Sequence, residues 1–220
     1  EVAVVTSIEY DHPDFFKTKK QYEDAFRKFV FALPPNGLLI AERHLKRILK
    51  KIPCRAVWYG IAGKVEGKHA ELNKKAALCA ARFLGIPSHT ARRSLANYTG
   101  TARRMEFYTS PSVETVVIDD YAHHPTEIRT TLASVRRQYQ KRIITVLFQP
   151  HTYTRTYALL SDFARAFTCA DEVVLLPVYS SMRERKEDFP KDLMEQLLRN
   201  ITRPLTKKLL SFENAIRYCK

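Results

Sequence analysis

The sequence predicts an α/β protein whose strands are mostly parallel, and three observations support this fold class. Two short apolar runs, residues 113–118 and 143–148, have the composition of buried strands. Each run leads into a polar loop and then into a segment with helical periodicity. Strand–loop–helix units in succession favour parallel neighbouring strands joined by right-handed crossovers. Apolar residues make up 45% of the 220 residues, which is enough for one or two packed cores.

In the first half of the chain, short apolar runs alternate with segments of helical spacing. Tyr22 and Phe26 recur on one helical face, and the PPNG sequence at residues 34–37 indicates a turn. Gly85 suits the C′ position of the helix before it, and Ser88 is expected to cap the helix after it. The elements predicted here are strands at residues 2–8, 38–41 and 55–59, and helices at residues 19–33, 45–52, 70–84 and 88–97.

In the second half, strands and helices alternate more regularly. Pro125 suits the first turn of a helix, and Glu127 is well placed for the helix macrodipole. The tail beyond Arg183 is charged and less regular. We expect a domain boundary at residues 98–101, which gives domains at 1–98 and 99–220. The elements predicted here are strands at residues 113–118, 143–148 and 172–177, and helices at residues 125–139, 155–168 and near 193–199.

Composition narrows the classes of partner and environment. The formal net charge of +14 favours anionic partners such as nucleotides, although a solvated basic surface explains it equally well. No run of about 18 apolar residues occurs, so we expect no membrane-spanning helix. The first residues lack the basic start of a signal peptide, so we do not expect them to be one. Because the chain begins directly in an apolar run, we expect a fragment of a longer protein. Four cysteines without a CxxC pair, Cys54, Cys79, Cys169 and Cys219, argue against zinc and for reduced thiols in a cytoplasm.

The candidate site comprises two polar loops, residues 119–127 (DDYAHHPTE) and residues 148–156 (FQPHTYTRT). Parallel neighbouring strands would bring both loops to the carboxyl edge of one sheet, where open α/β sheets bind ligands. That edge would hold two aspartates, three histidines, two tyrosines and an arginine. The plainer interpretation, helix-start chemistry, accounts for Pro125 and Glu127 but not for the polar residues before them. We do not expect a metal here, because Pro125 disturbs the register between His123 and Glu127.

A third polar loop, residues 7–14, supplies Glu9, Asp11, His12 and Asp14. These side chains suit Mg²⁺, which usually needs one or two protein ligands plus waters, although an ordinary polar loop is the simpler reading. The phosphate-loop pattern GxxxxGK[ST] does not occur, since Gly63-Lys64 and Gly67-Lys68 are followed by Val65 and His69.

Five motifs in order resemble those of the Mur ligases, the ATP-dependent ligases of peptidoglycan synthesis. The two polar loops above are the most specific, and their form is similar to that of the branch that adds L-alanine. The other three are residues 4–15 (VVTSIEYDHPDF), residues 67–73 (GKHAELN) and residues 100–104 (GTARR). The resemblance implies that residues 1–98 are the C-terminal half of the family's central ATPase domain. Residues 99–220 would then be its Rossmann-like C-terminal domain, with the UDP-binding domain and phosphate loop upstream.

The resemblance also implies an activity. ATP would phosphorylate the carboxylate of UDP-N-acetylmuramate, and the amine of L-alanine would attack the acyl phosphate, with Mg²⁺ and basic side chains neutralising charge. No nucleic acid or membrane partner is implied. The implied roles are a catalytic role for Asp120, His123 and Arg155; L-alanine binding by Tyr121, His123, His151 and Arg155; nucleotide binding by Asn73, Arg104 and Asp120; and Mg²⁺ binding by His12.

Three departures from the family pattern leave alternatives open. Ala70 replaces an Asn, Thr152 replaces an Arg that helps to hold the amino-acid carboxylate, and the stretch between Tyr59 and Gly67 is shortened. One alternative is a non-catalytic Mur-like remnant that binds a nucleotide or a partner. A nucleic-acid binder is less favoured, because basic and acidic residues are interleaved. A relative that acts on recycled tripeptide is a further possibility within the family.

Overall fold

The computed structural model describes residues 1–61, 69–110 and 113–218. The chain forms two compact units, Glu1–Thr99 and Gly100–Lys220, which we describe separately. Gly63, Gly67, Lys68 and Cys219, which the sequence analysis singled out, lie outside the described residues. None of the described helices is both long enough and apolar enough to cross a membrane.

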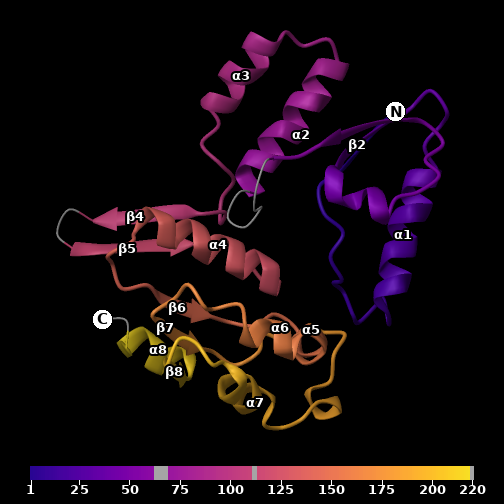
Figure 1. The fold of residues 1–220 in the computed structure, drawn as a ribbon. Helices are drawn as coiled ribbons and strands as arrows, with labels where there is room; N and C mark the ends of the chain where they lie inside the picture. Colours follow the sequence, from indigo (N-terminus) through magenta and orange to yellow (C-terminus); the bar gives the residue numbers. More distant parts are fainter. Residues whose placement is uncertain (62–68, 111–112, 219–220) are drawn as a thin grey trace. The chain divides into compact units, whose positions relative to one another are not determined.

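The first unit is a three-stranded parallel sheet with helices on both faces (Figure 1). Its strands have the order β1-β2-β3. The central strand is buried along its whole length, as expected for a parallel strand covered on both sides. The elements are β1 (Val2–Val5), α1 (Lys19–Phe31), β2 (Leu38–Glu42), the 3₁₀ helix η1 (Arg43–Arg47), β3 (Arg55–Tyr59), α2 (His69–Phe83) and α3 (Ser88–Ala96).

Alternation along β2 divides the core of this unit in two. Leu39 and Ala41 pack in a cluster with Val30 of α1, whereas Leu38 and Ile40 pack with residues of α2. This period-2 pattern is the one that β-strand geometry imposes. The predicted strands and the helices at 19–33, 70–84 and 88–97 are confirmed with shifted ends, whereas the segment predicted as a helix at 45–52 contains only the short η1.

The turn between α2 and α3 confirms one capping prediction and contradicts another. Gly85 has φ +74°, its N–H donates to the carbonyl of Arg82, and the N–H of Ile86 donates to the carbonyl of Ala81. These two bonds form a Schellman motif, which requires the left-handed conformation that glycine adopts without strain. The Ser88 prediction is wrong, because α3 begins at Ser88 itself and its N-cap is Pro87, which makes no side-chain cap.

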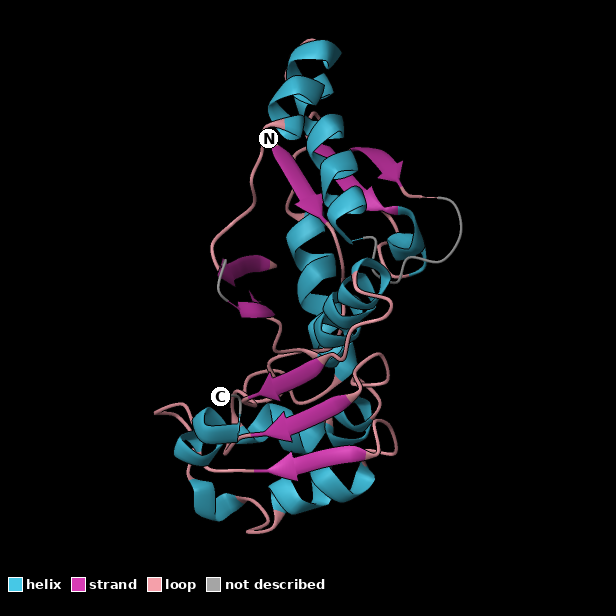
Figure 2. Ribbon diagram, turned by 90° about the vertical axis from the view of Figure 1, so that its left-hand side faces the viewer, coloured by secondary structure: helices cyan, strands magenta, loops and turns pink. Residues whose placement is uncertain are grey.

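The second unit contains a two-stranded antiparallel sheet and a three-stranded parallel sheet. Figure 2 shows the three strands of the parallel sheet, in the order β6-β7-β8, pointing the same way. The elements are β4 (Glu106–Ser110), β5 (Val113–Asp119), α4 (Pro125–Gln138), β6 (Thr145–Phe148), α5 (Tyr153–Ala158), α6 (Leu160–Ala164), β7 (Glu172–Leu175), the 3₁₀ helix η2 (Lys186–Asp188), α7 (Leu193–Asn200), β8 (Thr206–Leu209) and α8 (Phe212–Tyr218).

This topology corrects the sequence-based picture of the site. The strands that precede the two polar loops, β5 and β6, lie in different sheets, and β5 pairs antiparallel with β4. The prediction that one sheet edge gathers both loops is therefore wrong. The sequence analysis missed β4, which satisfies one edge of β5, and it missed β8 and α8. The helix predicted at 155–168 is two short helices, because the backbone leaves helical geometry at Leu159.

The parallel sheet of the second unit is anchored by aromatic packing. The ring of Phe148, at the end of β6, lies 5.6 Å from the ring of Phe163 and 5.4 Å from that of Phe167. Val173 and Val174 of β7 are fully buried. The loop after β6 therefore begins at a fixed point of the core.

Candidate functional site

The first polar loop folds together with the GTARR segment into one cluster, which we call the Tyr121 cluster (Arg103, Arg104, Asp120, Tyr121, His123 and Glu127). The N–H of Tyr121 donates to the carbonyl of Arg103 at 2.7 Å. The guanidinium carbons of Arg103 and Arg104 lie 5.2 and 5.5 Å from the centre of the Tyr121 ring. Both distances fall within the range of cation–π attraction. Two motifs that the sequence places 15 residues apart thus share one aromatic side chain.

Asp120 holds the backbone of this cluster in place. Its Oδ2 accepts the N–H of Met105 at 2.9 Å, and its Oδ1 accepts the N–H of Ala122 at 2.8 Å. Both carboxylate oxygens therefore accept backbone bonds, one from the residue that follows GTARR and one from the polar loop. Each oxygen has a second lone pair, so Asp120 keeps the capacity to accept a further hydroxyl proton.

Glu127 closes the cluster at the start of α4. Its Oε2 accepts the N–H groups of His123 and His124, and its Oε1 lies 3.6 Å from Nη1 of Arg104. The side chain of His124 accepts the N–H of Thr126, which completes a capping box. Burial alone would raise the pKa of Glu127. The bonds from His123 and His124 and the charge of Arg104 outweigh burial, so the pKa lies below its ordinary value.

His123 faces both the loop and α4. Its Nδ1 lies 3.0 Å from the carbonyl oxygen of Tyr121 and 3.5 Å from Oε2 of Glu127, and its ring meets that of Tyr121 edge to face. A carbonyl oxygen can only accept a hydrogen bond, so Nδ1 of His123 is the donor in this contact and carries a proton.

The second polar loop, residues 148–156, forms a separate group around Arg155. Arg155 is 4% exposed, and its Nη1 lies 3.0 Å from the carbonyl oxygen of His151 and 3.3 Å from His151 Nδ1. Thr152, the N-cap of α5, has φ +71°, and its Oγ1 accepts the N–H of Arg155 at 3.4 Å. A positive φ is strained for a β-branched residue and occurs where surrounding contacts enforce it.

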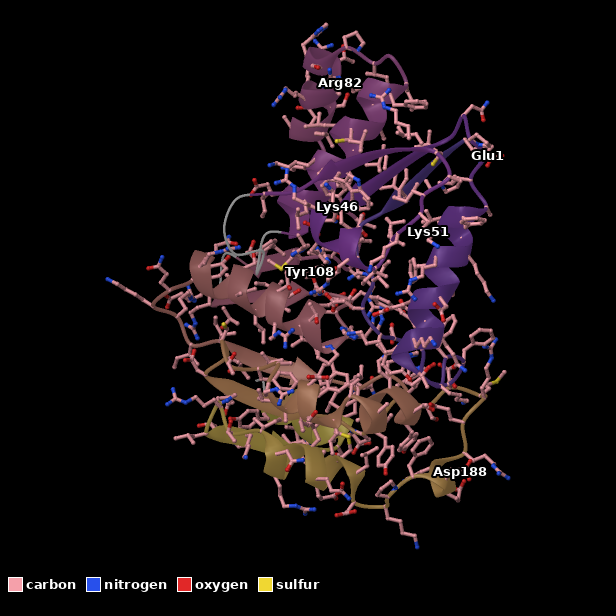
Figure 3. All side chains as sticks on the ribbon, turned by 45° about the vertical axis from the view of Figure 1, so that its right-hand side comes forward. Glu1, Lys46, Lys51, Arg82, Tyr108 and Asp188 are labelled. Atoms are coloured by element: carbon pink, nitrogen blue, oxygen red, sulfur yellow. The ribbon has the colours of Figure 1, made fainter. Side chains whose placement is uncertain are left out.

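Those contacts come from a segment that we call the strap, residues 177–189. The N–H of Thr152 donates to the carbonyl of Tyr179 at 2.9 Å, and the N–H of Tyr179 donates to that of Pro150 at 2.8 Å. The rings of Tyr179 and His151 stack at 5.5 Å with an interplanar angle of 15°. Figure 1 shows the strap beside α5, and Asp188, labelled in Figure 3, lies near its end.

Sequence reasoning missed the strap because its residues follow the strand predicted at 172–177 and run into the charged, irregular tail beyond Arg183. It also missed Arg103 and Glu184 as site residues. The only available signal was Tyr179, an aromatic residue shortly after a predicted buried strand. Such a residue is a weak indicator by itself.

The two remaining candidates lie in the first unit. His12 is an exposed loop residue with φ +55°. Its Nε2 lies 3.7 Å from Oδ2 of Asp11, and its Nδ1 lies 4.0 Å from Oδ1 of Asp14. Asn73, on α2, lines a shallow hollow of about 380 Å³ together with residues of β1, the following loop and α2: Val4, Thr6, Ala76, Ala77 and Ala80. Among the described residues, no three His, Cys, Asp or Glu side chains converge on a metal position.

Comparisons with known proteins agree with this two-unit organisation. Residues 1–99 match the family model for the Mur ligase middle domain, and residues 103–219 match that for the Mur ligase glutamate ligase domain. The UDP-N-acetylmuramate–L-alanine ligase of Rubrobacter xylanophilus is 37% identical over 82% of this chain and 47% of its own length. The enzyme of the same name from Caldanaerobacter subterraneus is 31% identical over the whole chain and 55% of its own length.

Solved structures show the same fold. The UDP-N-acetylmuramate–alanine ligase of Thermotoga maritima superposes on the whole chain with a TM-score of 0.66 at 23% identity, covering 53% of that protein. MurF of Acinetobacter baumannii superposes on 99% of the chain with a TM-score of 0.73 at 14% identity, covering 52% of that protein. This chain therefore spans about half the length of the relatives it matches. Because the two family models together match nearly every residue, the chain belongs to the Mur ligase family.

Proposed function

We propose that this chain forms part of an ATP-dependent ligase that joins L-alanine to UDP-N-acetylmuramate through an acyl phosphate. One observation carries the proposal. The loop at residues 119–127 and the GTARR segment, which resemblance links to nucleotide and amino-acid binding, fold into one hydrogen-bonded cluster. Relatives named for this reaction, 31–37% identical to the chain, support the choice of substrates.

In this proposal the second unit holds L-alanine. Tyr121, His123, His151 and Arg155 would form its pocket, with His123 and Arg155 in catalytic roles. Arg155 supports this role because a guanidinium removed from water binds a carboxylate more strongly than an exposed one does. The two histidine rings would orient the amine of L-alanine.

We further propose that Asn73, Arg104 and Asp120 are nucleotide-binding residues. The hollow beside Asn73 and the free lone pairs of Asp120 are compatible with these roles. ATP, when bound, supplies the phosphoryl group that activates the muramoyl carboxylate.

The fit of Mg²⁺ is partial. His12 lies among carboxylates, as a cation site requires, but the described residues do not converge on a complete ligand set. Mg²⁺ usually keeps several waters and takes only one or two protein ligands, so we propose His12 as one of those ligands. Residues 1–98 would then be the C-terminal half of the ATPase domain and 99–220 the C-terminal domain of a cytoplasmic enzyme.

A chimeric enzyme tests this function. The matching half of the Rubrobacter xylanophilus ligase is replaced by this chain, and phosphate release is measured with ATP, UDP-N-acetylmuramate and L-alanine. Release that depends on all three supports the proposal, whereas the chain alone should release none, since its sequence has no phosphate-loop pattern. A folded chimera that binds ATP but releases no phosphate would favour the non-catalytic remnant, an alternative that the departures at Ala70 and Thr152 leave open.

A further inference from the structure

We propose that Glu184, in the strap, is a positioning residue that fixes His151 and Arg155 in the orientation their roles require. The proposal deepens the function above and rests on it only for the identity of the amino acid. Glu184 accepts hydrogen bonds from Tyr153 and Thr154, which lie between His151 and Arg155. It acts through the backbone that carries both side chains.

The carboxylate of Glu184 accepts hydrogen bonds from three residues, Tyr153, Thr154 and Ser181. Oε1 accepts the N–H of Thr154 at 2.8 Å and also the hydroxyl of Thr154. Oε2 accepts the N–H of Tyr153 at 3.0 Å and that of Ser181 at 3.5 Å. Glu184 thus ties the first turn of α5 to its own strap, and it satisfies N–H groups that a helix start leaves without partners.

Two of these donors lie in the segment that bears both candidate side chains. Tyr153 and Thr154 lie between His151 and Arg155, so the carboxylate holds the middle of the segment whose two ends bear the candidate groups. Thr152 alone cannot hold this geometry, because its positive φ is strained and its cap bond to Arg155 is long, at 3.4 Å. Strained backbone persists only where neighbouring contacts enforce it.

The carboxyl group of Glu184 is held in its ionised form. Burial would raise the pKa of this carboxyl, but the bonds from Thr154, Tyr153 and Ser181 outweigh burial and hold it below the ordinary value. The carboxylate is therefore ionised at neutral pH, with two equivalent acceptor oxygens. A glutamine offers one acceptor and one NH₂ donor, so it can serve only one side of this network.

The experiment compares Glu184→Gln and Glu184→Ala with Glu187→Gln in the purified chain. Glu187 lies in the same strap, is exposed, and has no side-chain partner among the described residues, so it controls for the loss of an acidic side chain there. Three quantities are measured: hydrogen exchange at the Tyr153 and Thr154 amides, the NMR signals of the His151 ring, and the affinity for L-alanine. Amides of β7 report whether the core stays folded.

We expect Glu184→Ala to speed exchange at Tyr153 and Thr154 about tenfold or more and Glu184→Gln to speed it at one of these two amides. Both variants should shift the His151 ring signals and leave β7 unchanged. Affinity for L-alanine should fall about ten- to a hundredfold, as for the loss of a charge-assisted contact. Glu187→Gln should match the wild type. Unchanged exchange and unchanged His151 signals in Glu184→Gln would overturn the proposal, as would shifted signals with unaltered alanine affinity.

Failure of the proposed function has a different signature. If the wild-type chain shows no response to L-alanine at any concentration, the substrate is wrong, and the exchange and His151 signals alone decide the positioning role. If Glu184→Ala loses β7 protection as well, Glu184→Gln decides, because it keeps the volume of the side chain. A Glu184→Gln variant that also loses β7 protection would show a general folding role and would overturn the proposal.

Discussion

Nη1 of Arg155 lies 3.3 Å from Nδ1 of His151, four residues earlier, and 3.0 Å from the carbonyl oxygen of the same residue. Arginine is always a donor, so Nδ1 of His151 accepts and its proton resides on Nε2. The pair therefore presents an N–H of defined direction, and the guanidinium that fixes this direction is buried.

Arg155→Ala should reduce both stability and the response to L-alanine. The change removes bonds from a charged donor and leaves the carbonyl of His151 without that partner, at a cost of roughly 1.5–3 kcal/mol. Chemical denaturation and alanine titration measure the two effects. Arg165→Ala is the control, because Arg165 is 65% exposed and pairs only with Asp162 among the described residues. Equal stability of both variants would contradict the prediction.

Glu127→Gln should destabilise the chain at neutral pH and have less effect in acid. The folded pKa of Glu127 lies below 4.5, so its ionised form contributes stability that is present above that value. This contribution is lost as pH falls through the folded pKa. Free energies of unfolding at about pH 7 and about pH 3 should therefore differ between wild type and variant more at the higher pH. A difference independent of pH would refute the pKa argument.

Thr152→Gly should be more stable than Thr152→Ala by about 1 kcal/mol or more. Both variants lose the hydroxyl cap on Arg155, but only glycine adopts φ +71° without a steric penalty. Thermal or denaturant unfolding of the two variants measures the order. An alanine variant as stable as the glycine variant would show that position 152 is not strained.

Thr152→Arg tests the departure from the family pattern. In the chimeric enzyme, a second cation near the carboxylate should lower the Michaelis constant for L-alanine, by up to about tenfold for a contact of about 1.4 kcal/mol. The same change removes the α5 cap and should lower the melting temperature. Tighter binding of a larger amino acid in place of alanine would indicate a pocket built for another substrate.

Limited proteolysis should cut the chain first near residues 98–101. The two compact units meet at Thr99 and Gly100, residues 97–100 are exposed, and Gly100 has φ +103°. Exposed connections with few contacts are the usual sites of first cleavage. A protease of broad specificity and mass spectrometry locate the cut. First cuts inside α4 would show that the boundary is elsewhere.

Local sequence rules succeeded where the determining contacts are local. The Schellman turn at Gly85 and the Pro125 start of α4 depend on residues a few positions apart, and both follow from sequence. Sheet membership failed, because β5 pairs with β4, a short segment without clear alternation. The periodicity of residues 113–118 does not reveal which strand they pair with, because strand pairing depends on contacts distant in the sequence.

The same distinction holds for the candidate site. Residue type and spacing predicted His151, Arg155 and the Tyr121 loop as site residues, and their roles stay predictions. The contact of Arg104 with the Tyr121 ring and the hydrogen bond from Thr154 to Glu184 could not be predicted from the sequence. Each depends on a backbone path that the sequence does not encode locally.

The bonds between the loop and the strap also set an order of events during synthesis. Thr154 and Glu184 are 30 residues apart, and Thr152 meets Tyr179 across 27 residues. Until the ribosome has released the strap, the strained Thr152 backbone and the first turn of α5 have none of these partners. Closing such a loop costs chain entropy that only later contacts repay, so this part of the site is completed late, after β7 has been made.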